Sequence, residues 1–276
     1  MTAAPRPRLG VFKFASCDGC QLSLLNLEDE LLLLSERVEI AHFLEATSRV
    51  DEGPLDVALV EGSVTTAHDV ERIRAVRERT AVLVTIGACA TSGGIQALRN
   101  LADVEEWKAH VYPHPEWISA LPTSTPISDH VKVDHQIQGC PVNGTQVLRV
   151  LGRLLLGAAP DLPVASVCME CKRRGNPCVI VTRGIPCLGP VTRAGCGALC
   201  PSLGRDCYAC FGPAADPNPL SLVRSFEAAG MSQADAARRL RGINGWRREF
   251  RELADRLEGR TPAPPPGHAP APGDRS

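Results

Sequence analysis

Cys17 and Cys20 form a C-x-x-C motif between two apolar segments of different periodicity. Residues 9–14, before the motif, are a short apolar run typical of a β-strand, and the leucine-rich residues 21–35 after it indicate a helix. Two thiolates three residues apart can reach one metal centre, and the N-terminus of a following helix favours their negative charge. The motif alone is compatible with a redox dithiol, half of a zinc site or half of an iron–sulfur site.

Composition excludes several classes of protein. The chain has 276 residues, 12 cysteines and a formal net charge of −1, so it lacks the basic footprint of a nucleic-acid-binding protein. It has no apolar run long enough for a membrane span, and its first residues contain neither an apolar signal core nor a twin-arginine leader. We therefore expect a cytoplasmic protein. The reducing cytoplasm disfavours disulfides, so 12 cysteines indicate metal binding.

The first half of the sequence alternates strand-like and helix-like segments. Strands are expected at residues 9–14, 38–43, 55–60, 81–86 and 131–137, and helices at residues 21–35, 70–79, 93–101 and 145–156. Thr66 and Asp69 have the spacing of a capping box, and Asn143 is placed to cap the last helix. This alternation predicts an α/β fold with a doubly wound parallel sheet covered by helices on both faces.

Four cysteines follow the ends of these expected strands. Cys17 and Cys20 follow the first strand, Cys89 follows residues 81–86, and Cys140 follows residues 131–137. The carboxyl ends of parallel strands lie at one edge of a sheet, where ligands bind. Four thiols are thus expected to converge on a tetrahedral metal centre or a cubane cluster. A thioredoxin-like dithiol would not need Cys89 and Cys140, which disfavours that reading.

The remaining eight cysteines lie in a segment rich in proline and glycine that begins near residue 161. They are Cys168, Cys171, Cys178, Cys187, Cys196, Cys200, Cys207 and Cys210. Two structural zincs would use eight cysteines, but zinc modules have regular paired knuckles and often a histidine, and no histidine lies between His135 and His268. The irregular spacing favours iron–sulfur ligation. Twelve cysteines also divide into three sets of four.

Four motifs in this order resemble the small subunit of nickel–iron hydrogenases, in the superfamily of the NADH:ubiquinone oxidoreductase 20 kDa subunit. They are Phe14-Ala-Ser-Cys-Asp-Gly-Cys-Gln, Val60-Glu-Gly-Ser-Val, Gly87-Ala-Cys-Ala-Thr-Ser-Gly-Gly-Ile and Gln138-Gly-Cys-Pro-Val. The resemblance covers about residues 8–213. It implies that residues 8–158 form a flavodoxin-like domain without flavin. It also implies that Cys17, Cys20, Cys89 and Cys140 hold a proximal [4Fe–4S] cluster.

The second half resembles the same family and departs from its respiratory members. Cys168 stands where those members have a histidine ligand, which implies a distal [4Fe–4S] cluster on Cys168, Cys171, Cys178 and Cys187. Cys200 stands where they have a proline, which implies a medial [4Fe–4S] cluster, and not a three-iron centre, on Cys196, Cys200, Cys207 and Cys210. The pattern is most similar to the cytoplasmic, NAD(P)-linked sulfhydrogenase delta subunits.

The resemblance implies an electron-transfer subunit of an oxidoreductase, with no catalytic acid or base of its own. Three [4Fe–4S] clusters would relay electrons between the nickel–iron site of a large subunit and diaphorase-type flavin and iron–sulfur subunits that react with NAD(P). A relay subunit of a non-hydrogenase redox complex, or a zinc-stabilised interaction module, remains an alternative. We expect residues 161–213 to form a two-cluster domain, 218–258 a helical tail and 259–276 a disordered end.

Two further features of the sequence each have two interpretations. Glu61, at the end of an expected strand, either bonds to the proximal site or caps a helix. The arginine cluster between residues 238 and 256 is expected to be a solvated helix face and less often a docking patch.

Overall fold

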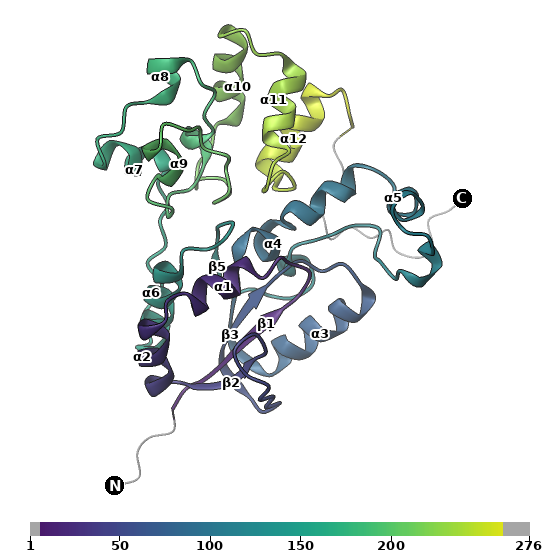
Figure 1. The fold of residues 1–276 in the computed structure, drawn as a ribbon, viewed down its shortest axis with the longest axis vertical. Coiled ribbons are helices and arrows are strands. Elements are labelled where there is room, and N and C mark those ends of the chain that lie inside the picture. Colours follow the sequence, from purple (N-terminus) through teal and green to yellow (C-terminus); the bar gives the residue numbers. More distant parts are fainter. Residues whose placement is uncertain (1–5, 262–276) are drawn as a thin grey trace.

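The computed structural model describes residues 6–261, and the first half of this range is built on a five-stranded sheet (Figure 1). The strands are β1 (Arg8–Lys13), β2 (Glu39–Phe43), β3 (Leu55–Glu61), β4 (Thr80–Ile86) and β5 (His135–Ile137). They are arranged in the order β2-β1-β3-β4-β5, and every neighbouring pair is parallel. This order is that of the flavodoxin-like doubly wound sheet, so the predicted fold class is confirmed.

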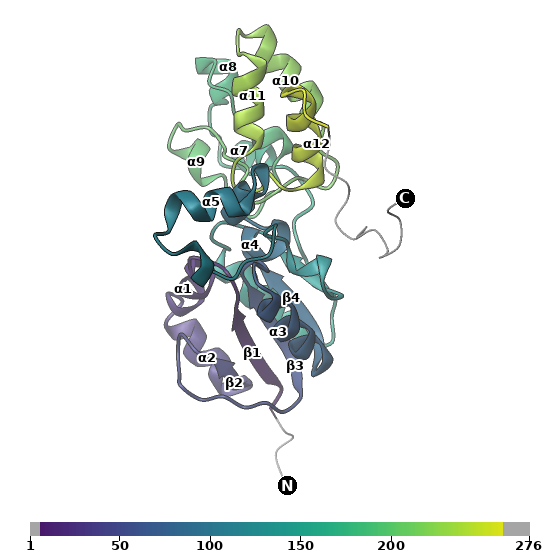
Figure 2. The same ribbon diagram turned by 90° about the vertical axis from the view of Figure 1, so that its right-hand side faces the viewer.

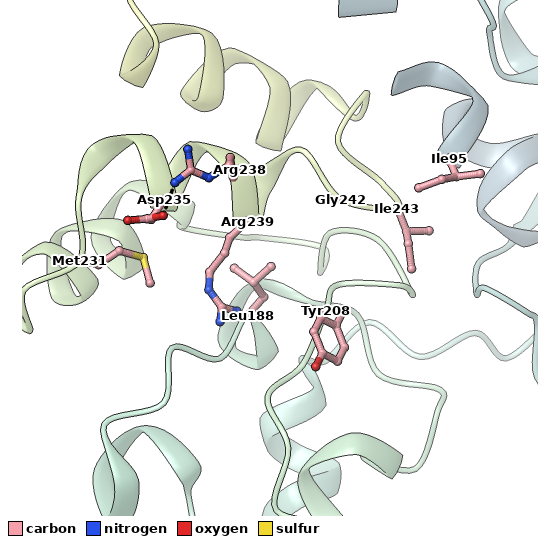
Figure 3. Close-up of a pocket in the computed structure, with 9 residues that line it drawn as sticks. All are labelled: Ile95, Leu188, Tyr208, Met231, Asp235, Arg238, Arg239, Gly242 and Ile243. Carbon is pink, nitrogen blue, oxygen red and sulfur yellow. Dashed lines mark hydrogen bonds and ion pairs between the residues drawn. The ribbon is translucent and has the colours of Figure 1, made fainter. Parts of the chain in front are cut away.

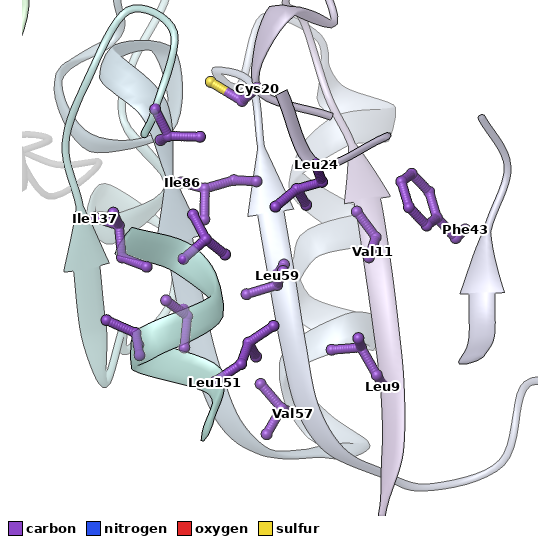
Figure 4. Packing of buried hydrophobic residues seen from close by; sticks show 14 of the residues in the cluster. Leu9, Val11, Cys20, Leu24, Phe43, Val57, Leu59, Ile86, Ile137 and Leu151 are labelled. Atoms are coloured by element: carbon purple, nitrogen blue, oxygen red, sulfur yellow. The ribbon is translucent and has the colours of Figure 1, made fainter. Parts of the chain in front are cut away.

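Alternate residues of each strand bury their side chains on opposite faces of the sheet. On one face Val57 and Leu59 of β3 pack in a cluster with Leu151 of helix α6 (Gly144–Leu155), as Figure 4 shows. On the other face Val60 packs in a second cluster with Ile73 of helix α3 (Ala67–Glu78). Each such fully buried aliphatic side chain contributes about 1.5–3 kcal/mol, so two hydrophobic layers hold this half together.

Several helix boundaries follow local sequence signals. Thr66 and Asp69 form the expected capping box at the start of α3, and the Asn143 side chain accepts a hydrogen bond from Gln146 N at the start of α6. The helix expected at residues 21–35 is wrong as a single element. It is divided into α1 (Gly19–Leu25) and α2 (Asp29–Arg37), because Glu28 adopts a φ of 45° and interrupts the helical hydrogen bonds.

One other expectation is corrected, at the edge strand β5. The strand expected at residues 131–137 is shorter, because only His135–Ile137 pair with β4. Residues 87–92, which carry Cys89, form a short helix α4 (Gly87–Ser92) directly after β4. The segments between α4 and β5 are η1 (Ile95–Leu101), α5 (Val104–Val111), η2 (Pro115–Trp117) and η3 (Ile127–Asp129).

The cysteine-rich segment contains only short helices. These are α7 (Val167–Arg173), α8 (Val179–Arg183), η4 (Gly189–Val191) and α9 (Leu199–Ser202), followed by the longer α10 (Pro219–Ala228), α11 (Gln233–Leu240) and α12 (Arg248–Leu257). Ser232 caps α11 by accepting a hydrogen bond from Asp235 N, as its spacing predicts. Leu188 and Ala209 share one core with Phe226 and Phe250, so α10–α12 pack directly on the cysteine-rich segment.

The second half lies against the carboxyl edge of the sheet (Figure 2). Ser92 of α4 donates a hydrogen bond to Asn244 at 2.7 Å, and Asn143 donates one to the Gly195 carbonyl at 3.1 Å. Within residues 6–261, no helix is both long and apolar enough to cross a bilayer. Of the end expected to be disordered, residues 259–276, the part from 262 onward lies outside the described residues, whereas Arg260 N donates a hydrogen bond to the Asp255 carbonyl at 2.8 Å.

Candidate metal centres

Cys17, Cys20, Cys89 and Cys140, here called the edge group, lie at the carboxyl edge of the sheet. Cys17 follows β1, Cys20 begins α1, Cys89 lies in α4 after β4, and Cys140 follows β5. Burial, followed by negative charge at Cys140 and Cys17, raises the pKa of Cys89 to about 11, although a hydrogen bond with Gln96 opposes the rise. Burial, and then Glu61, Cys89 and Cys140, raise the pKa of Cys20. The strand topology has therefore brought four thiols that are distant in sequence within electrostatic reach of one another.

Glycines make room for the sulfur atoms of the edge group. Gly94 has a φ of 60°, and a Cβ there would lie 2.7 Å from Cys89 Sγ. Gly87 has a φ of 86°, and a Cβ there would collide with Cys20 Sγ. Both positions need the left-handed backbone region that glycine adopts without strain, and both leave no space for a side chain beside a thiol.

Glu61 is buried at the end of β3, and its carboxylate caps α1. It accepts hydrogen bonds from Cys20 N at 3.1 Å and Gln21 N at 3.2 Å. Burial raises the pKa of Glu61, and these hydrogen bonds oppose the rise. Glu61 therefore caps a helix, but this helix is α1, which carries Cys20, and not the next helix in the chain, α3, which Thr66 caps.

Cys168, Cys171, Cys178 and Cys187, here called the outer group, gather around α7 and α8. Cys168 and Cys171 lie one helical turn apart on α7, Cys178 precedes α8, and Cys187 precedes η4. Burial raises the pKa of Cys168, and the charges of Cys171, Cys187 and Cys178 raise it further. The structure thus brings these four thiols together.

Cys196, Cys200, Cys207 and Cys210, here called the middle group, lie between the other two groups. Burial, followed by the charges of Cys196, Cys200 and Cys140, raises the pKa of Cys210 to about 12. On the other side, Cys207 N donates to Cys187 Sγ at 3.1 Å. The three groups are therefore in contact in the order edge, middle, outer.

The donor chemistry and the spacing of the thiols suit polynuclear clusters. All twelve cysteines are free thiols, and thiolates are the ligands of iron–sulfur clusters. In the part of the chain that the structure describes, no three Cys, His, Asp or Glu side chains come close enough to hold a single metal ion. A single zinc draws four sulfurs to about 2.3 Å from one point, whereas a cluster holds its thiolates on separate iron atoms. The residues present, twelve free cysteines, are a donor set that fits iron–sulfur clusters.

Two polar residues beside the thiols had not been singled out from sequence. Gln96 of η1 accepts a hydrogen bond from Cys89 Sγ at 3.2 Å and donates one to the Ala15 carbonyl at 3.0 Å. Glu170 accepts hydrogen bonds from Gly195 N and Ala198 N, which flank Cys196. The position of Glu170 inside the motif Cys168-Met-Glu-Cys171 is a signal that could have found it. No sequence signal links Gln96 to Cys89.

The arginine cluster is only partly the solvated helix face expected from the sequence. Arg238 is exposed and pairs with Asp235. Arg241 is buried and pairs with Asp255 and Glu258, and Arg251 is buried with its guanidinium 4.6 Å from the centre of the Trp246 ring. Two of these arginines thus belong to the interior, where they brace α11 and α12.

A large surface cavity lies beside the middle group but contains none of its thiols. It has a volume of about 580 Å³ between η1, the Cys207–Cys210 loop and α11 (Figure 3). Ile95, Leu188, Tyr208 and Met231 make it mainly apolar, and Arg239 at its wall pairs with Asp206 at 2.6 Å. The chemistry-bearing thiols lie outside this hollow.

Comparison with known proteins agrees with this geometry. Residues 17–154 match the family model of the NADH ubiquinone oxidoreductase 20 Kd subunit. The chain is 39% identical to sulfhydrogenase 2 subunit delta of Pyrococcus furiosus over 87% of this chain and 100% of that protein. It is 36% identical to a subunit of the F420-non-reducing hydrogenase vhu of Methanocaldococcus jannaschii, over 74% of this chain and 81% of that protein.

Solved structures show the same fold. An NAD+-reducing [NiFe]-hydrogenase chain matches with a TM-score of 0.54 and 33% identity, over 57% of this chain and 96% of its own length. An actinobacterial-type NiFe-hydrogenase chain from Ralstonia eutropha H16 matches with a TM-score of 0.57 and 18% identity, over 95% of this chain and 94% of its own. The chain belongs to the NADH ubiquinone oxidoreductase 20 Kd subunit family, and within it to the small subunits of nickel–iron hydrogenases of the sulfhydrogenase delta type.

Proposed function

We propose that this chain relays electrons inside a cytoplasmic nickel–iron hydrogenase through three [4Fe–4S] clusters. The edge group would hold the proximal cluster, the middle group the medial cluster and the outer group the distal cluster. A large subunit carrying the nickel–iron site is the partner at the edge group. An NAD(P)-reactive flavin partner is the electron acceptor or donor at the outer group.

The observation that carries this proposal is that the three groups of thiols follow one another in space across the molecule. The charge of Cys140 in the edge group raises the pKa of Cys210 in the middle group, and Cys207 N of the middle group donates a hydrogen bond to Cys187 Sγ of the outer group at 3.1 Å. Electron transfer needs closely spaced centres, and this arrangement supplies three adjacent sets of ligands from one end to the other.

The protein's own residues hold the ligands and exclude water. A cluster held by four cysteine thiolates supplies one-electron transfer when bound. Cys20, Cys187 and Cys207 are buried, so each group has at least one ligand removed from solvent. Backbone N–H groups aimed at sulfur, such as those of Gly189 at 3.4 Å and Cys207 at 3.1 Å from Cys187 Sγ, favour negative charge on the ligands.

Two kinds of electron acceptor are candidates for this chain. The NAD-reducing hydrogenase HoxS subunit delta of Cupriavidus necator is 30% identical over 56% of this chain and 82% of that protein, which leaves much of this chain unmatched. The match to the F420-non-reducing hydrogenase vhu of Methanococcus voltae extends over 82% of this chain. This wider coverage favours, as a second candidate, an acceptor other than a nicotinamide cofactor.

Anaerobic purification of the chain with its bound partners tests the relay. We expect about twelve irons per chain, at four per cluster, with nickel in a co-purifying subunit and hydrogen-dependent reduction of NAD(P)+. Iron without nickel would indicate that the chain relays electrons in a redox complex other than a hydrogenase. Zinc without iron would indicate that the chain is a zinc-stabilised interaction module and does not transfer electrons.

The assignment of the eight cysteines to an outer and a middle group needs its own test. The charge of Cys196, in the middle group, also raises the pKa of Cys171, in the outer group. Replacing Cys200 by proline removes one proposed middle-group ligand and should leave a three-iron centre there. Such a centre is paramagnetic when oxidised, so EPR of the oxidised protein should show a new signal. Cys168→His, in the outer group, is the control and should add no such signal. Absence of the signal from the Cys200 variant contradicts the division.

A further inference from the structure

The surface around the outer and middle groups carries five exposed cations. These are Lys172, Arg173, Arg174, Arg183 and Arg205. Within residues 6–261 none of them forms an ion pair with a carboxylate. Arg174, Arg183 and Arg205 instead donate to the Gly197 carbonyl, the Gly204 carbonyl and the Tyr208 hydroxyl. Their positive charge therefore remains available to another molecule.

Of the three carboxylates in residues 161–213, Asp161 is exposed at the start of the segment, and the other two are turned inward. Glu170 accepts hydrogen bonds from Gly195 N at 2.9 Å and Ala198 N at 3.2 Å. Asp206 is buried and pairs with Arg239 of α11 at 2.6 Å. Neither carboxylate neutralises the exposed cations. The chain as a whole is nearly neutral, so this segment has a distinctly basic surface.

A hollow of about 550 Å³ opens in this basic surface between α8 and α9. Pro177, Val179, Arg183, Pro201 and Leu203 line it. Pro177 adjoins Cys178 of the outer group, and Pro201 adjoins Cys200 of the middle group. Val181 and Leu203 beside it are 82% and 73% exposed, which is unusual for large aliphatic side chains. The hollow thus combines apolar walls, one unpaired guanidinium and proximity to two thiol groups.

We propose that this surface, defined by the hollow and the five cations, docks the acidic face of a redox-partner protein. An apolar side chain of the partner fills the hollow, and its carboxylates pair with Lys172, Arg173 and Arg183. The inference rests on the proposed function, because it takes this end of the relay as the exit for electrons. It adds the charge sign of the partner, which the family resemblance leaves open.

A second copy of this chain is a poorer occupant. Two copies meeting through this surface would oppose cations to cations, and like charges across an interface disfavour association. An acidic partner is attracted instead, and electrostatic steering raises association rates by 10-fold or more at low ionic strength. Protein electron transfer with transient docking depends on such rates.

The test uses this chain in complex with its large subunit, after the NAD(P)-reactive flavin partner has been removed at high salt, with two protein acceptors of opposite charge. Hydrogen-dependent reduction of an acidic plant-type ferredoxin is compared with that of basic cytochrome c, from low to high ionic strength. We expect kcat/KM for the ferredoxin to exceed that for cytochrome c at low salt and to fall about 10-fold as salt screens the charges. A preference for cytochrome c, or no salt dependence, overturns the inference.

Charge variants locate the effect. Arg183→Glu should lower kcat/KM for ferredoxin about 10-fold at low salt, and Arg183→Lys should retain most of it because the charge is kept. Lys172→Glu is a second reversal at an exposed position. Arg74→Glu makes the same charge change on α3, at an exposed site on the sheet half, and should leave the ferredoxin rate unchanged. An equal loss in the Arg74 variant overturns the placement.

Two readouts separate this inference from the proposed function. Iron content and the EPR spectra of the reduced protein show whether each variant retains its metal centres. Hydrogen-dependent viologen reduction by the unaltered complex tests the relay itself. If viologen is not reduced, the proposed function fails. If viologen is reduced but the ferredoxin rate ignores charge and salt, only the docking surface fails.

Discussion

The two halves of the molecule hold their cysteines in different ways. The sheet half has hydrophobic layers on both faces of five strands, and the edge group extends from the ends of those strands. In the cysteine-rich segment, the cluster around α7 and α8 consists of Val167, Val179, Ala198 and the thiols Cys187 and Cys207. The first site is carried by a formed scaffold, whereas in the second the ligands are part of the core. Metal should therefore matter more to the fold of the second.

Removal of iron under anaerobic conditions should have the largest effect on that contrast. We expect α7–α9 to lose backbone amide protection by on the order of 100-fold or more, because their short helices have little apolar core without metal. Strands β1, β3 and β4 should keep most of theirs. Hydrogen exchange with mass spectrometry measures both regions in one sample. Equal loss in the two halves would mean that the sheet also depends on metal.

Ligand substitutions should separate the halves functionally. Cys89→Ala should abolish hydrogen-dependent reduction of both a dye and a protein acceptor, because the relay is broken at its first group. Cys178→Ala should spare much of the dye reduction, since small dyes can take electrons from earlier groups, but should abolish reduction of the protein acceptor. Steady-state rates with the two acceptors measure this difference. Dye reduction at the unaltered rate in the Cys89 variant would contradict the relay.

The glycines of the edge group offer a test of how rigid the first scaffold is. Gly94→Ala should lower the free energy of unfolding by about 2–4 kcal/mol, because a left-handed backbone is combined with a collision at Cys89. Gly157→Ala is the matched control, since it has a φ of 68° with open space around it, and should lose only about 1 kcal/mol. Denaturant titration measures both. Similar losses would show that the space beside Cys89 is not constrained.

The junction between the halves should respond to pH with a smaller effect. Burial raises the pKa of Asp129 in η3 to about 6, and Arg251 of α12 partly opposes this rise. A carboxyl whose folded pKa is raised stabilises the fold below its unfolded pKa, and this stability is lost as pH rises from about 4 to about 6. After discounting for partial exposure, Asp129→Asn should therefore stabilise the protein by roughly 1–2 kcal/mol at pH 8 and by less at pH 5.

Asp134 provides the control of opposite sign. Burial would raise its pKa, but hydrogen bonds from Leu83 N and Arg77 hold the pKa of Asp134 below its usual range. Its ionised form stabilises the fold, so Asp134→Asn should destabilise the protein most at high pH. Denaturation at pH 5 and pH 8 compares the two variants. A gain from Asp129→Asn that does not grow with pH would contradict the assigned pKa.

Where sequence signals were local, they predicted the structure well. The capping box at Thr66 and Asp69 and the cap at Asn143 are present, because each depends on residues three positions apart. The sequence pattern did not indicate the break in the leucine-rich helix, because leucines recur on both sides of Glu28 and no glycine or proline marks its positive φ. Gln96 beside Cys89 was missed because seven residues and a helix boundary separate them.

The sequence by itself determined the parallel α/β fold and the placement of four thiols at one sheet edge. Strand periodicity and right-handed crossovers leave few other arrangements, and residues after successive parallel strands must share an edge. Only the tertiary structure decided that Glu61 caps α1, that Arg241 and Arg251 are interior, and that the exposed cations around α8 form no ion pair with a carboxylate of residues 6–261. Those properties depend on which side chains from distant segments meet, and no local pattern encodes that.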